Sequence, residues 1–316
     1  MRLSAPSQPN LDFPGPETFI EALKKSLPDF GSVEWVSHTG STNADLSLRA
    51  KDRADAPPKP WLLGAHLQTA GKGRAGRPWA NEAGGTLMFS CAFSHKIPLA
   101  LLPGLAPAIG VSTCLALRSF IKQQCAGTMS KSALQDLLDH LRLKWPNDLL
   151  WRGAKLAGLL IETAPSSTIV IGMGINLRGA ATLSAQLERE IADLSQVEQA
   201  LQGRSLDDAP ATLDPIKLVT PFALTSLVAI FAQAWQTALQ TFATNGYEAF
   251  THSFAIVDAL TGQAVQVMDQ GKILYQGPAQ GTDSMGRLRV MTDAGEIPVL
   301  FGDVSIRPVH PFKGTP

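Results

Sequence analysis

The alternation of apolar and polar residues is most regular after Thr220, where it has the period of an α-helix. Threonine is a good helix N-cap, and Pro221 suits the first helical position because its missing N–H has no partner there. One face of this predicted helix is apolar and is formed by Leu224, Leu227, Val228, Phe231, Trp235, Leu239 and Phe242. We interpret this face as core packing rather than as a ligand groove.

Other helices are predicted earlier in the chain. Residues 17–27 form a short amphipathic pattern that a proline ends. Residues 97–117 carry no charge over 21 positions, enough for a membrane span, but prolines and glycines interrupt the first half. A buried helix that begins near Pro107 is the better interpretation. Apolar residues at helical spacing predict a further helix over 184–202, ended by Gly203.

Strand patterns accompany these helices up to about residue 180, and a second group follows residue 255. The first strand segments are 33–46, which continues through a turn into a helix, 61–68, 84–93, the two hairpins of 141–163, and 169–177. From about Ile256 short strands separated by glycine-containing turns fill the rest of the chain. This pattern predicts a small all-β module of about 55 residues that closes into a barrel.

Length and composition fit one large domain followed by a small one. We assign residues 1–16 to a flexible N-terminal tail, 17–254 to the large domain and 255–316 to the β-module. The 27 Lys and Arg residues balance 27 Asp and Glu residues, so net charge indicates neither DNA nor an anionic membrane as a partner. Three cysteines without metal-binding spacing, and an N-terminus without a signal peptide's apolar stretch, indicate a cytoplasmic protein.

The segment TAGKGRAGRPW, residues 69–79, contains the GxGxxG spacing of a dinucleotide-binding turn. Such a turn must lead directly into a helix that receives the pyrophosphate, but here Pro78, further glycines and a strand follow. No GxxxxGK[ST] sequence for a phosphate-binding loop of the Walker type exists either. What remains is a glycine loop with three cations that can approach and neutralise an anion, or a solvated basic hairpin.

Four other motifs accompany this loop in a fixed order. They are STN (41–43) before it, and KWPNDL (144–149), KLAGLLIE (155–162) and GMGIN (172–176) after it. With these motifs the chain resembles the biotin protein ligases, which attach biotin to carboxylase carrier domains. The resemblance covers residues 35–178 and extends to the C-terminal β-module. It implies an α+β fold, a mixed β-sheet flanked by helices as in class II aminoacyl-tRNA synthetases, followed by a small SH3-like β-barrel.

The resemblance implies a reaction in two steps. Biotin and MgATP give biotinyl-AMP, and a lysine of the carrier then takes the biotinyl group. The positions that match the family's catalytic residues are Arg74, Arg77, Lys155 and Asp148. The sequence alone leaves open that Lys155 is a solvated strand residue, and that Asp148 braces a turn.

The resemblance also assigns the ligand contacts. The biotin-binding positions are Ser41, Thr42, Asn43, Gln68, Gly71, Lys72, Gly73, Gly158, Leu160, Gly172 and Gly174. The positions that contact ATP or the adenylate are Arg74, Arg77, Trp79, Asn147, Lys155 and Asn176, with Asp148 as a Mg²⁺ ligand. Ser41 or Thr42 can also cap the helix that follows.

Two departures from the family pattern are visible. Lys72 replaces an arginine that many members carry, and lysine cannot form a planar bidentate contact. An insertion is present at about 124–140.

Alternative functions follow from the same residues. They are a lipoate-type acyl-adenylate ligase and a catalytically inactive biotin-binding module. The form expected is one without an N-terminal DNA-binding domain, since only about 35 residues precede the core. The implied partner is the biotin carboxyl carrier protein of acetyl-CoA carboxylase and related carboxylases, with no DNA or membrane. Relatives pair through their sheets, so a homodimer is compatible.

Overall fold

The computed structural model describes residues 15–52, 56–82, 84–203, 216–269, 271–299 and 305–308. The helices are α1 (Pro16–Ser26), α2 (Thr42–Arg49), α3 (Leu105–Gln124), α4 (Lys131–Leu138), α5 (Ala180–Leu187), α6 (Leu194–Gly203), α7 (Pro221–Asn245) and α8 (Thr251–Val257), with 3-10 turns η1 (Arg74–Gly76), η2 (Leu99–Gly104) and η3 (Tyr247–Phe250). The strands are β1 (Ser32–Thr39), β2 (Trp61–Gln68), β3 (Thr86–Ser94), β4 (Leu141–Lys144), β5 (Asp148–Trp151), β6 (Ala154–Ala164), β7 (Thr168–Asn176), β8 (Ala264–Asp269), β9 (Lys272–Thr282), β10 (Leu288–Thr292), β11 (Gly295–Pro298) and β12 (Ser305–Pro308).

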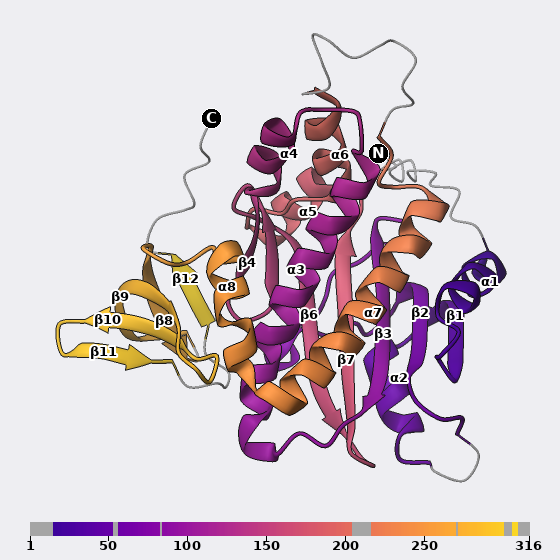
Figure 1. Ribbon diagram of the computed structural model, residues 1–316, viewed down its shortest axis with the longest axis horizontal. Coiled ribbons are helices and arrows are strands. Elements are labelled where there is room, and N and C mark those ends of the chain that lie inside the picture. Colours follow the sequence, from indigo (N-terminus) through magenta and orange to yellow (C-terminus); the bar gives the residue numbers. More distant parts are fainter. Residues whose placement is uncertain are drawn as a thin grey trace, which may run out of the picture.

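A mixed sheet of seven strands forms the centre of the molecule (Figure 1). Its strand order is β1-β2-β3-β7-β6-β5-β4, with β1 and β2 parallel and the other neighbours antiparallel. The predicted α+β class with a mixed sheet and flanking helices is therefore confirmed.

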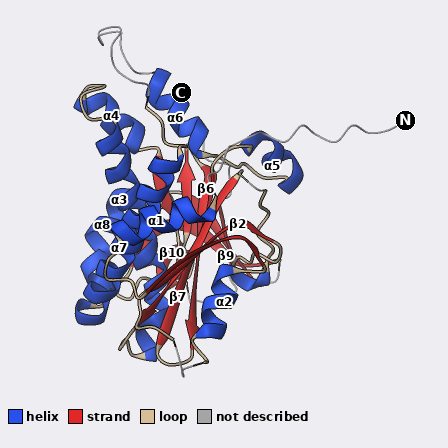
Figure 2. Cartoon of the chain, turned by 90° about the vertical axis from the view of Figure 1, so that its right-hand side faces the viewer, coloured by secondary structure: helices blue, strands red, loops and turns tan. Residues whose placement is uncertain are grey.

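Helices cover both faces of this sheet (Figure 2). In β2, Leu62 belongs to the main core under α3 and α7, whereas Trp61 and Leu63 pack with Leu46 of α2 on the opposite face. Successive strand residues point to opposite faces, so a strand buried on both sides reads as an unbroken apolar run. This explains why WLLGA in β2 shows no alternation.

The helices α3 and α7 are the longest and most apolar. With η2 included, Leu99–Gln124 and Pro221–Asn245 are each long and apolar enough to cross a membrane. In their most apolar stretches, 50% and 61% of the helix is buried inside the protein. The two helices pack against each other and against strands of the sheet. They are thus core helices, as predicted for both segments. Thr220 caps α7 as expected, accepting from the N–H of Ala223.

The prediction of a single helix over 184–202 is wrong. The chain forms α5 and α6 instead, separated by a connecting segment over 188–193. Glu188 ends α5 in the left-handed conformation, at φ 49°. Asp193 then accepts from the backbone N–H of Gln196 in the first turn of α6 and from Ala180 at the start of α5. Of the apolar residues at helical spacing, Leu194 and Leu201 of α6 reach the core. Ile191 is buried in the segment between the two helices, and Leu187 at the end of α5 is exposed.

The C-terminal strands form a five-stranded antiparallel sheet of order β11-β10-β9-β8-β12. This sheet lies beside α8 and the β4 edge of the large sheet (Figure 1). Trp145, between β4 and β5, is buried and donates its indole N–H to Gly286 O at 2.9 Å. The sequence correctly predicts an all-β module here. The tail expected over 1–16 lies almost wholly outside the described residues.

Candidate active site

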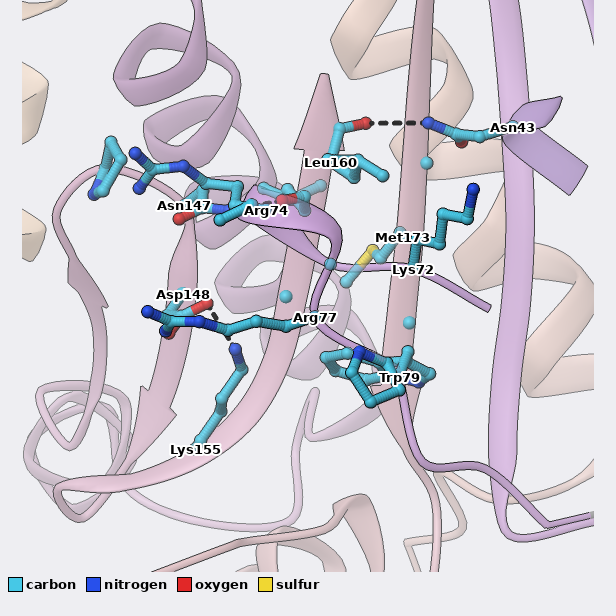
Figure 3. Close-up of a pocket in the computed structure, with 18 of the residues that line it drawn as sticks. Asn43, Lys72, Arg74, Arg77, Trp79, Asn147, Asp148, Lys155, Leu160 and Met173 are labelled. Atoms are coloured by element: carbon cyan, nitrogen blue, oxygen red, sulfur yellow. Dashed lines mark hydrogen bonds and ion pairs between the residues drawn. The ribbon is translucent and has the colours of Figure 1, made fainter. Parts of the chain in front are cut away.

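One cavity of about 460 Å³ opens on the large sheet and collects most of the predicted residues. Its walls come from the β1–α2 turn, the end of β2, the glycine loop and strands β3, β5, β6 and β7. The predicted residues that line it are Ser41, Thr42, Asn43, Gln68, Lys72, Gly73, Arg74, Arg77, Trp79, Asn147, Asp148, Lys155, Gly158, Leu160, Gly172 and Gly174. Segments more than 100 residues apart therefore converge on one space (Figure 3).

The glycine loop is a closed hairpin over the cavity. Lys72 and Pro78 form a β-bridge, and the N–H of Gly73 donates to Arg77 O at 2.7 Å. Between them η1 makes a single 3-10 turn. The segment leads into Trp79 and β3, not into an α-helix. The exclusion of a dinucleotide-binding turn is therefore confirmed.

One end of the cavity is polar and neutral. Gln68 Oε1 accepts from the backbone N–H of Thr42 at 2.7 Å, and Ser90 Oγ lies 2.6 Å from Thr42 Oγ1. Ser41 occupies the N-cap position of α2, but its side chain makes no capping hydrogen bond. Thr42 and Ser90 are almost fully buried. Burying so many uncharged donors and acceptors around a cavity favours a neutral polar ligand group.

The other end of the cavity is cationic. Lys155 Nζ donates to Asp148 Oδ1 at 2.6 Å, and Arg74 and Arg77 approach from the loop. Burial acts to raise the pKa of Asp148, but the Lys155 ammonium and, more weakly, Lys144 and Arg189 outweigh it, so that this pKa is lowered. Asp148 is therefore a carboxylate at neutral pH, and it holds Lys155 in place while two arginines supply further positive charge.

Paired glycines in β6 and β7 create a flat surface between these ends. Gly158 and Gly174 are neighbours in the ladder, and the indole of Trp79 packs against both. A Cβ at Gly174 would lie 2.5 Å from the indole, and Lys155 Nζ is 5.3 Å from the ring centroid. The indole N–H is buried without a hydrogen-bond partner. The surface thus accepts a flat aromatic ring and leaves one donor unused.

Two predicted residues do not line the cavity. The carbonyl of Gly71 accepts from Trp79 N at 2.9 Å, which closes the loop. Asn176 is buried and donates to Lys155 O at 3.2 Å and Ala192 O at 3.0 Å. It therefore ties the start of β6 to the connecting segment before α6.

Asn147 lines the cavity and also has a bracing role. Its side-chain amide donates to Leu159 O, and Leu159 N donates back to Asn147 O at 3.0 Å. The turn before β5 is in this way fixed to β6, next to Asp148.

Several further residues of the site were not predicted from the sequence. Ser90, Lys144, Met173, Arg189 and Glu190 also line the cavity. A signal for Ser90 existed, since it is a polar residue within the apolar run TLMFSCAF. Arg189 and Glu190 fall in the segment wrongly predicted as helix, so no pattern pointed to them.

The insertion at about 124–140 lies outside the cavity. The insertion forms α4, which packs against α6, and none of its residues lines the cavity. Among the described residues no three His, Cys, Asp or Glu side chains gather as a metal cage. Asp148, the predicted Mg²⁺ ligand, lines the cavity and is paired with Lys155.

Comparison with known proteins agrees with this site. A model described as "Biotin/lipoate A/B protein ligase family" matches residues 36–176. The biotin--[acetyl-CoA-carboxylase] ligase of Mycobacterium tuberculosis is 38% identical over 164 residues, which are 50% of this chain and 56% of that protein. The bifunctional ligase/repressor BirA of Escherichia coli is 27% identical over 248 residues, covering 77% and 65% of the two chains. The chain thus spans less than two thirds of the length of these relatives.

Solved structures show the same fold. The biotin protein ligase from Aquifex aeolicus in complex with biotin and ATP superposes with a TM-score of 0.62 at 22% identity, covering 88% of this chain and all of that one. Ordered motifs, fold and matches agree. The chain is therefore similar to biotin protein ligases, and its residues 36–176 match the biotin/lipoate A/B protein ligase family.

Proposed function

We propose that the protein uses ATP to attach biotin to one lysine of a biotin carboxyl carrier domain, through biotinyl-5'-AMP. ATP and biotin are the substrates, Mg²⁺ accompanies ATP, and AMP and pyrophosphate are released. The Mycobacterium tuberculosis relative, named as a biotin--[acetyl-CoA-carboxylase] ligase, supports this activity, as does the solved relative with biotin and ATP.

One observation carries the proposal: a single cavity joins a buried neutral polar end to an end with three cations. Biotin has this division, with a neutral urea ring at one end and a carboxylate at the other. Thr42 and Gln68 are the groups we assign to the urea, with Ser41 and Asn43 beside them. The wall between the two ends, which includes Leu160, Met173 and Gly172, receives the aliphatic tail.

In the first step a carboxylate oxygen of biotin attacks the α-phosphorus of ATP, and the bond to pyrophosphate breaks. Both reactants are anions, so their approach depends on the cations at that end of the cavity. We assign this role to Arg74, Arg77 and Lys155, with Asp148 holding Lys155 and carrying a Mg²⁺ contact. Trp79 and Asn147 are assigned to the adenosine part, since Trp79 already packs on the glycine surface, and Asn176 supports this part from behind the cavity wall.

In the second step the amine of the carrier lysine attacks the acyl carbon of the adenylate, AMP leaves, and the amine loses a proton. The mixed anhydride also reacts with water, so it must be covered until the carrier arrives. The hairpin of residues 69–79, including Gly71, Lys72 and Gly73, is the cover in this proposal.

The domain division belongs to the same proposal. Residues 17–254 are the catalytic domain, residues 255–316 an SH3-like β-barrel, and residues 1–16 a tail. The partner is the carrier protein of acetyl-CoA carboxylase or a related carboxylase, in the cytoplasm. A homodimer is compatible with β1, the edge strand of the large sheet that lies away from the C-terminal module.

A lipoate-type ligase is the second candidate, because the matching family includes lipoate ligases. The observation against it is the neutral polar end of the cavity. The dithiolane ring of lipoate has no N–H or C=O groups to pair with Thr42, Gln68 and Ser90, and burying them unpaired would weaken binding.

Labelled pyrophosphate exchange into ATP tests both candidates. We expect exchange that depends on biotin and not on lipoate. Exchange with lipoate alone would assign the protein to the second candidate. Absence of exchange with either acid, in protein whose folding is verified by circular dichroism, would leave only a binding module.

A further inference from the structure

A chain of hydrogen bonds leads from Glu162, exposed on β6, to the neutral end of the cavity. Asn43 Nδ2 donates to Glu162 Oε2 at 2.8 Å, and Asn43 Oδ1 accepts from Ser90 Oγ at 2.6 Å. Ser90 Oγ in turn lies 2.6 Å from Thr42 Oγ1. Only Glu162 is exposed, since Asn43, Ser90 and Thr42 are 5%, 0% and 2% exposed.

The direction of every bond in this chain follows from its outer end. The nitrogen of the Asn43 amide faces two groups that can only accept, the Glu162 carboxylate and Leu160 O at 3.4 Å (Figure 3). The amide oxygen therefore faces Ser90, and Ser90 must donate to it. Because a hydroxyl has one proton, the proton between Ser90 and Thr42 belongs to Thr42, which directs it to Ser90 Oγ at 2.6 Å and, at the longer distance of 3.2 Å, to Gln68 Oε1.

This order leaves the Thr42 oxygen as an acceptor toward the cavity. Gln68 is ordered in the same way, because its Oε1 accepts the Thr42 backbone N–H at 2.7 Å. Its Nε2 is then the donor, directed at the weak acceptor Met88 Sδ at 3.1 Å. The neutral end thus offers an acceptor at Thr42 beside a donor at Gln68, the pattern that complements the N–H and C=O groups of a urea.

We propose that Glu162 is a positioning residue which, through Asn43 and Ser90, fixes Thr42 as an acceptor for a ligand N–H. The inference rests on the proposed function, since the urea of biotin is the group that this order suits. Without a charged acceptor at position 162, an exchange of the amide O and N of Asn43 would reverse each bond and make Thr42 a donor. Gly172 allows the arrangement, because a Cβ there would collide with the Asn43 amide.

The proposal is tested by reversing the direction of the hydrogen bond between positions 43 and 162. Asn43→Asp places a second acceptor against the Glu162 carboxylate, while Ser90 can still donate to it. Glu162→Gln on the same chain supplies a side-chain N–H that donates to the carboxylate introduced at position 43. The double variant therefore restores the order of the chain with its two members exchanged. The control is Asn43→Asp with Glu248→Gln, since Glu248 is exposed and lies outside the cavity.

The measurement is the KM for biotin in pyrophosphate exchange, with the KM for ATP and the melting temperature of each variant. We expect Asn43→Asp to raise the KM for biotin about a hundredfold, while the KM for ATP stays within about twofold. Adding Glu162→Gln should recover about tenfold, and Glu248→Gln should recover nothing. Calorimetric titration with biotin replaces kinetics for any variant too slow to assay.

Two outcomes contradict the inference in different ways. If wild-type protein exchanges with biotin and Asn43→Asp has the same KM with and without Glu162→Gln, the positioning role is wrong and the proposed function stands. If folded wild-type protein shows no biotin-dependent exchange and no biotin binding, the proposed function and this inference both fail.

Discussion

Single residues at the cationic end of the cavity act through their charge, and the ion pair between Lys155 and Asp148 shows how. The two side chains are 17% and 26% exposed, so water screens them only in part. Asn176 holds the backbone carbonyl of Lys155 from the other side. The ammonium is therefore fixed in position before any anion enters.

The first prediction concerns Lys155→Gln. Because this removes a positive charge from the end assigned to the reacting carboxylate and phosphate, biotin-dependent exchange should slow about a hundredfold in kcat. The exchange rate at saturating biotin and ATP is the measurement. Lys96→Gln is the control, because Lys96 is exposed and does not line the cavity. Equal loss in both variants would contradict a specific role.

The second prediction concerns the pH dependence of Asp148. Its pKa is lowered from 3.8 in the folded protein, so the ion pair contributes stability that is complete above about pH 4 and is lost as pH falls through the lowered pKa. The difference in melting temperature between wild type and Asp148→Asn should be constant from pH 5 to about 8. It should shrink only below about pH 4. A difference that already declines between pH 7 and 6 would contradict the lowered pKa.

At the scale of secondary-structure elements, the main contact of the site is the one between the glycine hairpin and strands β6 and β7. The hairpin is closed by its own backbone bonds, and Trp79 anchors it to Gly158 and Gly174. One aromatic side chain thus holds the cover against the sheet. The hairpin can lie in this position because Gly158 and Gly174 have no Cβ atoms that would meet the indole of Trp79.

The third prediction follows from that anchor. Gly174→Ala should displace the indole and release the hairpin, so trypsin should cut after Lys72 or Arg74 several-fold faster than in the wild type. Gly203→Ala is the control, because no atom lies within 4 Å of a Cβ there. Mass spectrometry of the first fragments locates the cut. Unchanged cleavage at the hairpin would show that Trp79 does not anchor it.

How far the sequence predicts the structure also differs between elements. The ends of β2 were predicted from an apolar run followed by the glycine hairpin, and α7 from Thr220 and Pro221, because these signals are local. Ser90 was missed because its contacts with Asn43 and Thr42 depend on strand pairing far along the chain. The break at Glu188 was missed for the same reason, since the segment after it is held by a bridge between Ile191 and Lys155.

The candidate site shows the same limit. Ordered motifs identified Thr42, Gln68 and Lys155, but the sequence could not show that Trp79 packs on the paired glycines. It also could not place Asn176 behind the cavity wall rather than in it. Such facts depend on how side chains fill space once the sheet has formed.

Across the whole molecule, the small sheet and the cavity are connected through Trp145. Its indole donates to Gly286 O in the small module, and it belongs to the turn that also carries Asn147 and Asp148. A second tie is the hydrogen bond between Tyr247 and Thr282, with 3.0 Å between their hydroxyl oxygens. The C-terminal module thus supports the turn at the cationic end of the cavity.

The fourth prediction concerns this connection. Trp145→Phe keeps most of the buried volume but leaves Gly286 O without its donor, which should destabilise the protein by about 1–2 kcal/mol. Thermal unfolding should show a melting temperature lower by about 2–4 °C. The KM for ATP should rise as well, because the turn loosens. Retention of both values would show that the module does not support the site.

Intact-mass spectrometry of a carrier domain shows whether this chain transfers biotin to a carrier lysine. The purified protein would be incubated with a biotin carboxyl carrier domain, biotin and MgATP, beside samples lacking ATP or containing lipoate. We expect a mass increase of one biotinyl group, on one lysine, only when biotin and ATP are both present. A carrier that keeps its mass in the presence of folded protein, or gains only a lipoyl group, would contradict it.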